Sequence, residues 1–98
     1  MSSFTTRVEL HYANDNDYDQ LHQAMEREGF SRLIQGGDGR WYQLPTAEYN
    51  RETELAIETV RESAARAAAS TGRNHSVLVS QATSRAWIGL PVVQPAYR

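Results

Sequence analysis

Side chains that could move a proton lie close together near the start of the chain. His11 ends a segment of alternating apolar residues, and Asp15 and Asp17 come shortly after it. A histidine beside carboxylates could act as a general acid or base in RNA cleavage, taking the proton of the 2′-hydroxyl. Asp15, Asp17 and Asp19 could also hold a magnesium ion through their oxygens. The alternative is that Asp15 and Asp17 cap a helix and that His11 is a solvated strand residue.

The basic residues are all arginine, and they offer a second kind of chemistry. The net charge of −2 argues against a protein that coats nucleic acid by bulk electrostatics. A guanidinium fork nevertheless suits phosphate, so Arg7, Arg32 and Arg40 could form a local RNA-binding site if the sheet brings them together. Tyr42 could add an exposed ring for base stacking. The alternatives are that Arg7 pairs with Glu9 across strands, and that the ring of Tyr42 is a dimer contact or hydrophobic cover.

The glycine-rich stretch at 36–39 has the composition of a phosphate loop, but the elements on either side of it differ from those of a phosphate loop. A phosphate loop lies between a strand and a helix and continues into Gly-Lys-Ser/Thr, whereas Gly36-Gly37-Asp38-Gly39 joins two short apolar segments. Residues that tolerate positive φ suit a tight reversal. We therefore predict a hairpin turn.

Composition excludes several classes of protein. Cysteine is absent, which removes disulfides, thiolate metal sites and a cysteine nucleophile. His11, His22 and His75 show neither H-x-x-x-H nor H-x-E spacing, so we predict no metal and no cofactor. No apolar run approaches the roughly 20 residues of a membrane span, and the first residues lack the apolar core of a signal peptide. We expect a cytoplasmic protein without membrane contact.

The spacing of apolar residues predicts the elements that must position these side chains. Residues 4–12 alternate with period two, which is typical of a half-buried strand. Tyr18, Leu21, His22 and Met25 follow helical spacing. In order, we predict a strand at 4–12, a helix at 18–28, strands at 32–35 and 40–44, a helix from Asn50 or Thr53 to Thr71, and strands at 75–80 and 85–90.

This order is that of the α+β, ferredoxin-like split βαβ fold (β-α-β-β-α-β), in which two helices cover one face of a four-stranded antiparallel sheet. Residues 85–90 would supply an extra C-terminal strand. We expect a single domain over 1–98, with an ordered core at about 4–90 and a loose tail at 91–98. The edge strand around Trp41–Tyr42, or the 85–90 hairpin, offers unpaired backbone groups through which a homodimer could form.

Three segments resemble a known family. They are FTTRVELHYANDNDYDQLHQAMEREGFSRLI (4–34), YQLPTAEYN (42–50) and VLVSQATSRAWIGL (77–90). They are similar to the GhoS family, the small endoribonuclease antitoxins of type V toxin–antitoxin systems, and to their uncharacterised bacterial and prophage relatives. The resemblance implies a ferredoxin-like fold, similar to that of the small CRISPR-associated nucleases, and cleavage of a toxin's messenger RNA. His11 stands at the strand end where active members carry an aspartate.

Two functions follow as hypotheses. The first is a GhoS-like RNA-acting antitoxin that cleaves single-stranded toxin mRNA, with His11 as general acid or base and Asp15 or Asp17 orienting it. Arg32 and Arg40 would hold phosphate. The second is a non-catalytic, dimeric protein-interaction module, prophage- or plasmid-borne, that binds through a sheet edge.

Overall fold

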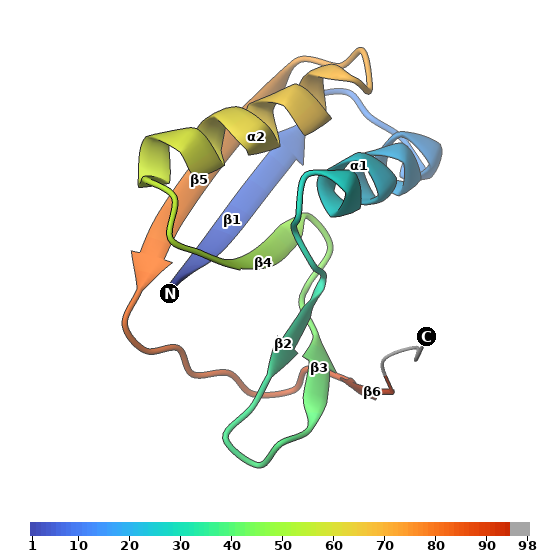
Figure 1. The fold of residues 1–98 in the computed structure, drawn as a ribbon. Coiled ribbons are helices and arrows are strands. Elements are labelled where there is room, and N and C mark those ends of the chain that lie inside the picture. Colours follow the sequence, from blue (N-terminus) through green and yellow to red (C-terminus); the bar gives the residue numbers. More distant parts are fainter. Residues whose placement is uncertain (95–98) are drawn as a thin grey trace.

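A central strand, β1 (Ser2–Leu10), organises the molecule, and two others pair with it to form the first sheet. The computed structural model describes residues 1–94. Along the chain the elements are β1, α1 (Asp15–Arg27), β2 (Leu33–Gln35), β3 (Trp41–Gln43), β4 (Glu48–Thr53), α2 (Ile57–Ala69), β5 (His75–Ala82) and β6 (Val92–Val93) (Figure 1).

The first sheet has the order β4-β1-β5, with both pairings antiparallel. Both helices lie on one side of it (Figure 1). Ser31 extends the sheet beyond β4, because its backbone exchanges hydrogen bonds of 2.8 and 2.7 Å with Asn50. Two crossovers, one through each helix, therefore connect strands of the same sheet. This is the split βαβ arrangement of an α+β, ferredoxin-like fold, as predicted.

A second sheet, of order β2-β3-β6, projects away from the helices (Figure 1). β2 and β3 form a hairpin around residues 36–40, and the amide of Gly36 donates to the carbonyl of Arg40 at 2.9 Å. The predicted hairpin turn is thereby confirmed. The structure thus divides its strands between two three-stranded sheets, where the sequence predicted one sheet of four strands.

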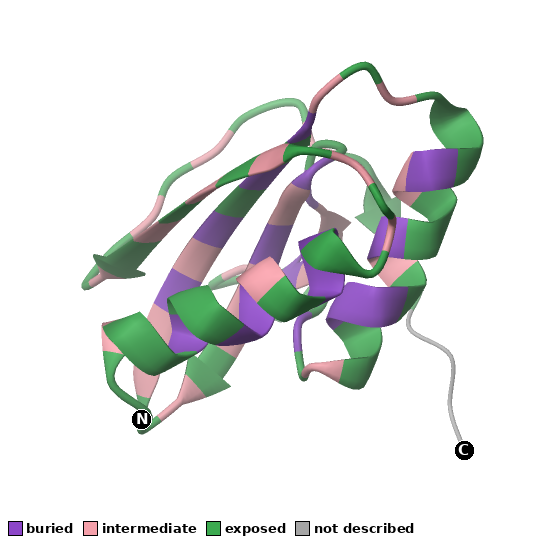
Figure 2. Ribbon diagram, turned by 90° about the horizontal axis from the view of Figure 1, so that it is seen from above, coloured by how far each residue is buried: buried purple, intermediate pink, exposed green. Residues whose placement is uncertain are grey.

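The core lies between the first sheet and the helices, as the buried positions in Figure 2 show. Every second residue of β1 faces it, which confirms the period-two pattern. Alanines on α2 let that helix approach the sheet closely. The buried apolar residues of this cluster are Phe4, Val8, Leu10, Leu21, Ala24, Met25, Phe30, Tyr49, Val60, Ala64, Ala67 and Ala68.

Three predicted elements differ from the observed ones. Residues 48–53 form β4, whereas the sequence predicted a helix from Asn50 or Thr53, and α2 begins at Ile57 without a side-chain cap. The strand predicted at 85–90 is absent, since this stretch crosses between the sheets without a strand partner. Val92–Val93, expected in the loose tail, pairs with β3; the rest of that tail, 95–98, lies outside the described residues.

Candidate functional site

His11 lies just beyond β1, on the face of the sheet that the helices leave open. Its Nε2 is 3.1 Å from the hydroxyl of Ser76 and 4.0 Å from a carboxylate oxygen of Glu9. No hydrogen bond or ion pair within residues 1–94 joins His11 to Asp15 or Asp17. The three predicted catalytic side chains therefore do not form one cluster in this structure.

Asp15 and Asp17 belong to the start of α1. The Asn14 amide donates to Asp17 Oδ2 at 3.0 Å, and the Asp17 amide donates to Asn14 Oδ1 at 2.9 Å, which is a reciprocal capping box. Arg73 Nε also donates to Asp17 Oδ2, at 2.9 Å. Asp17 is buried and Asp15 is exposed. Their capping role is confirmed for Asp17, and the alternative of a magnesium site lacks geometric support, since no three potential ligands gather within residues 1–94.

The predicted RNA-binding arginines lie apart from one another. Arg7 pairs with Glu48 across the open face, at 3.7 Å. Arg40 is exposed on the β2–β3 hairpin and lines a hollow beside β6. Arg32 lines a different hollow, beside α1. A single anion site made of all three is therefore not formed.

Tyr42, the predicted stacking ring, is held within its own hairpin. Its hydroxyl donates to Asp38 Oδ2 at 2.7 Å, and that hydrogen bond lowers the pKa of the Asp38 carboxyl. The ring meets Trp87 edge-on, with centroids 5.5 Å apart. Tyr42 and Trp41 are both only partly exposed. The face of Tyr42 that remains open is thus limited by its contact with Trp87.

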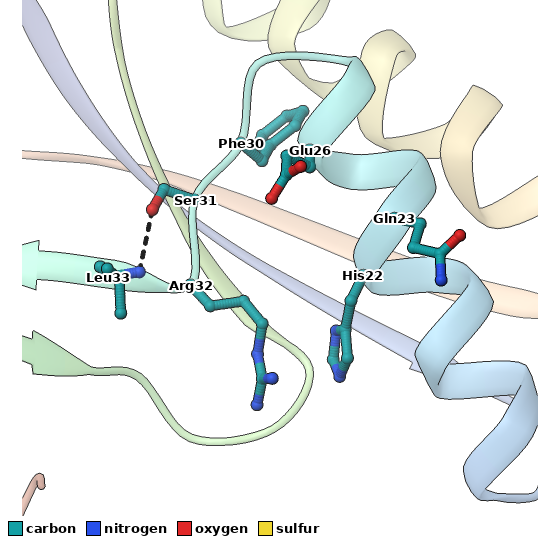
Figure 3. A pocket seen from close by; sticks show the side chains of 7 residues that line it. All are labelled: His22, Gln23, Glu26, Phe30, Ser31, Arg32 and Leu33. Atoms are coloured by element: carbon teal, nitrogen blue, oxygen red, sulfur yellow. Dashed lines mark hydrogen bonds between the residues drawn. The ribbon is translucent and has the colours of Figure 1, made fainter. Parts of the chain in front are cut away.

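A hollow of about 370 Å³ brings one predicted residue, Arg32, together with residues of α1 (Figure 3). Gly29 makes it possible, because its φ of +94° ends the helix and turns the chain back along it. Figure 3 shows Arg32 and His22 reaching into the same space from opposite walls, while Glu26 lies toward Phe30. The lining residues are His22, Gln23, Glu26, Phe30, Ser31, Arg32 and Leu33.

His22 is anchored from behind by Tyr49 of β4. The Tyr49 hydroxyl is 2.6 Å from His22 Nδ1, and burial raises the pKa of that hydroxyl, which keeps it protonated. In the tautomer in which this hydroxyl donates to Nδ1, the imidazole hydrogen lies on Nε2. Burial, and then the charge of Arg32, lower the pKa of His22 below its ordinary 6.5. His22 is therefore a neutral imidazole at pH 7 with an N–H to offer.

Arg32 brings a donor that its own chain leaves unpaired. Its Nε is buried and has no hydrogen-bond acceptor among the described residues. An unpaired buried donor costs roughly 1–3 kcal/mol, and a charged one costs more. Arg32 and the Nε2–H of His22 together suit a phosphate group.

Sequence reasoning missed this hollow, although one signal pointed to it. His22 stands in the apolar stripe of its helix, and a polar side chain in such a stripe needs a partner inside the fold. That partner, Tyr49, lies on a strand that the sequence did not predict. Arg32 was identified as a phosphate ligand, but with Arg40 in place of His22.

Neither helix is long and apolar enough to span a membrane, within residues 1–94. In comparisons with known proteins, no family model matches this chain and no curated protein matches its sequence.

Proposed function

We propose that this protein is an RNA-acting antitoxin like those of the GhoS family, an endoribonuclease that binds single-stranded toxin mRNA at the His22–Arg32 hollow. The observation that carries this proposal is the guanidinium of Arg32 beside the neutral imidazole of His22 in one hollow. Both side chains carry hydrogen-bond donors, which a phosphodiester accepts.

The rest of the hollow supports a nucleotide rather than a bare phosphate. Gln23 and Glu26 line the same space and carry acceptor oxygens. In Figure 3 Glu26 lies away from the ends of Arg32 and His22. A phosphate at the basic end would leave room for the base edge near Glu26, where an exocyclic amino group could donate to the carboxylate.

The proposed cleavage needs no group beyond the chain and water. The ribose 2′-oxygen bonds to phosphorus while its proton passes to water, and the bond from phosphorus to the 5′-oxygen breaks. Arg32 stabilises the charge that develops on the phosphoryl oxygens. The bound phosphate favours a protonated His22, whose Nε2–H supplies the proton that the departing 5′-oxygen takes up. The products are a 2′,3′-cyclic phosphate and a free 5′-hydroxyl.

The test is cleavage of end-labelled single-stranded RNA by five proteins: the wild type, His22→Ala, Arg32→Gln, His11→Ala and Arg40→Gln. We expect loss of at least about a hundredfold in rate for His22→Ala and Arg32→Gln, because each removes a group that acts on the reacting phosphate. EDTA should leave the rate unchanged. Arg40→Gln is the matched control, since it removes the same charge from an exposed position outside the hollow.

The outcomes separate the candidate sites. Loss in His11→Ala with full activity in His22→Ala would move the chemistry to the open face of the sheet and reject the hollow. Equal loss in Arg32→Gln and Arg40→Gln would mean that only total charge matters.

The second candidate is a non-catalytic protein-interaction module, and one observation favours it. Ile88 is 96% exposed and borders a hollow of about 360 Å³ between the two sheets, lined mainly by apolar side chains. An exposed apolar side chain at the rim of such a hollow is typical of a protein contact. A wild type that neither binds nor cleaves any RNA would favour this module.

A further inference from the structure

Within residues 1–94, one outer edge of the first sheet is a strand with no pairing partner on its far side. β5 lies at that edge and is eight residues long, HSVLVSQA. It contains no aspartate, glutamate, lysine, arginine or proline. Monomeric proteins protect exposed edges with such residues, with bulges, or with a covering segment. An edge this long and this uncharged favours pairing with another strand.

The register fixes which backbone groups of β5 are free. The amide of His11 donates to the carbonyl of Asn74 at 2.8 Å, in line with the pairing of β1 and β5. In an antiparallel pair such contacts recur at every second residue, so Ser76, Leu78 and Ser80 direct their backbone groups to β1. The backbone groups of Val77 and Val79 therefore point away from the sheet.

We propose that a second copy of this chain pairs its β5 with this β5, antiparallel and centred on Leu78. In that register the outward groups of Val77 face those of the partner's Val79, and each pair exchanges its hydrogen bonds. Leu78, 64% exposed in the single chain, meets the same residue of the other copy on the open face. The result is a continuous six-stranded sheet, three strands from each copy.

Alternative centres fit less well. Centring the pairing on Val79 would set Leu78 opposite Ser80 and leave its apolar surface without an apolar partner. Centring on Leu78 places Ser76 opposite Ser80 on the open face and Val77 opposite Val79 on the other face, so that residues of the same kind meet across the pairing. The sequence of β5 is nearly symmetric about Leu78, with valine and then serine on each side of the leucine.

The charges beside the edge complement those of a second copy. A groove of about 240 Å³ runs between β5 and α2, and Glu58 and Arg61 line it with Ile57 and Val79. Neither Glu58 nor Arg61 forms an ion pair with another residue in the described part of the chain. A two-fold axis through the edge would bring Glu58 of each copy toward Arg61 of the other, and the charges would attract across the interface.

Sedimentation velocity of the purified chain over a range of concentrations tests the proposal. We expect a dimer of about 22 kDa, twice the 11.1 kDa of one chain. Leu78→Arg sets two like charges opposite each other, so we expect its dissociation constant to rise by roughly a hundredfold or more. Val92→Arg is the matched control, because it adds the same charge at an exposed position on β6, outside β5, and should leave the dimer unchanged.

A charge exchange tests the orientation of the two copies. Glu58→Arg should weaken the dimer, and Glu58→Arg combined with Arg61→Glu should restore it, since the swapped charges attract again. Circular dichroism confirms that each variant folds. A wild type that stays monomeric at all concentrations overturns the proposal and leaves a strand of another protein as the occupant. A dimer that survives Leu78→Arg, or is lost in Val92→Arg, also overturns it.

Discussion

Asp17 links the start of α1 to the loop before β5, because one carboxylate oxygen serves both the Asn14 amide and Arg73. Asp17→Ala should therefore lower the free energy of unfolding by about 1–3 kcal/mol, through loss of the cap and of the ion pair. Urea denaturation measures this. Asp15→Ala is the control, since its side chain is exposed in the same turn and should cost about 0.5 kcal/mol or less.

The same pair of variants separates structural from catalytic roles. If Asp17 acts only on the fold, Asp17→Ala should cleave RNA at the wild-type rate at temperatures where it remains folded. Equal stability of the two variants would contradict the capping role.

His22 makes stability depend on pH. Its pKa lies below its ordinary 6.5 in the folded chain, so below that pH the unfolded chain takes up a proton more readily. The stability that neutral His22 contributes is present above about pH 6.5 and is lost as the pH falls. We predict that His22→Gln loses stability less steeply than the wild type between about pH 7 and pH 5.

Urea denaturation at a series of pH values gives the two profiles, and subtracting them removes the contribution of the carboxylates. Parallel profiles would contradict the lowered pKa. A phosphate-containing ligand in the hollow should oppose the effect, because its charge favours the protonated imidazole.

Local contacts of single residues could be predicted from the sequence, but contacts between distant residues could not. Asp17 could be assigned to a cap because a cap depends on neighbours within one turn. The hydrogen bond between His22 and Tyr49 links residues 27 positions apart in the sequence. It depends on β4, whose position is set by tertiary structure. Residue types suggested proton transfer and phosphate binding, but the partners of each group follow from tertiary structure.

Among the elements, α1 depends on one glycine for its C-terminal turn. Gly29 has a φ of +94°, and a Cβ there would lie 3.2 Å from the Arg51 side chain. Gly29→Ala should therefore lower the free energy of unfolding by about 1–2 kcal/mol. Gly37→Ala is the matched control, because nothing lies within 4 Å of its added Cβ and its φ is not in the left-handed region.

Urea midpoints of the two variants decide the prediction. A Gly37→Ala change as large as that of Gly29→Ala would mean that general flexibility, and not the left-handed turn, sets the cost. RNA cleavage by Gly29→Ala should fall as well, since the turn positions Arg32 opposite α1.

β4 shows why one element could not be predicted. Its sequence, EYNRET, has a single large apolar residue, Tyr49, and lacks the alternation that identified β1. Arg51 takes the next inward position and covers the ring of Phe30, with its guanidinium carbon 5.3 Å from the ring centroid. The glutamates of this stretch precede α2, and acidic residues are typical of the first turn of a helix, so the sequence favoured a helix here. Only pairing with β1 makes it a strand.

At the scale of the whole molecule, residues 83–91 connect the two sheets, and Arg85 fastens this connection to the first. Its guanidinium donates to Asn50 at 2.7 Å and Thr5 at 3.2 Å, and lies 3.5 Å from Glu52. The strand predicted at 85–90 does not form, and the side-chain contacts of Arg85 hold this segment against the open face of the first sheet instead. Apart from β4, the order of the helices and strands before it could be predicted from local patterns, whereas the division into two sheets could not.

β1 is the first strand of the chain and the central strand of its sheet, and this order affects folding. Ser3 pairs with Glu52 on one side and with Ala82 on the other, so both partners of the first strand are far from it in the sequence. During synthesis β1 has no strand partner until β4 has emerged, and it gains its second partner only with β5. Pairings of such long sequence separation slow folding. The same arrangement makes the finished domain hard to unfold from its amino end, since β1 is held along both edges.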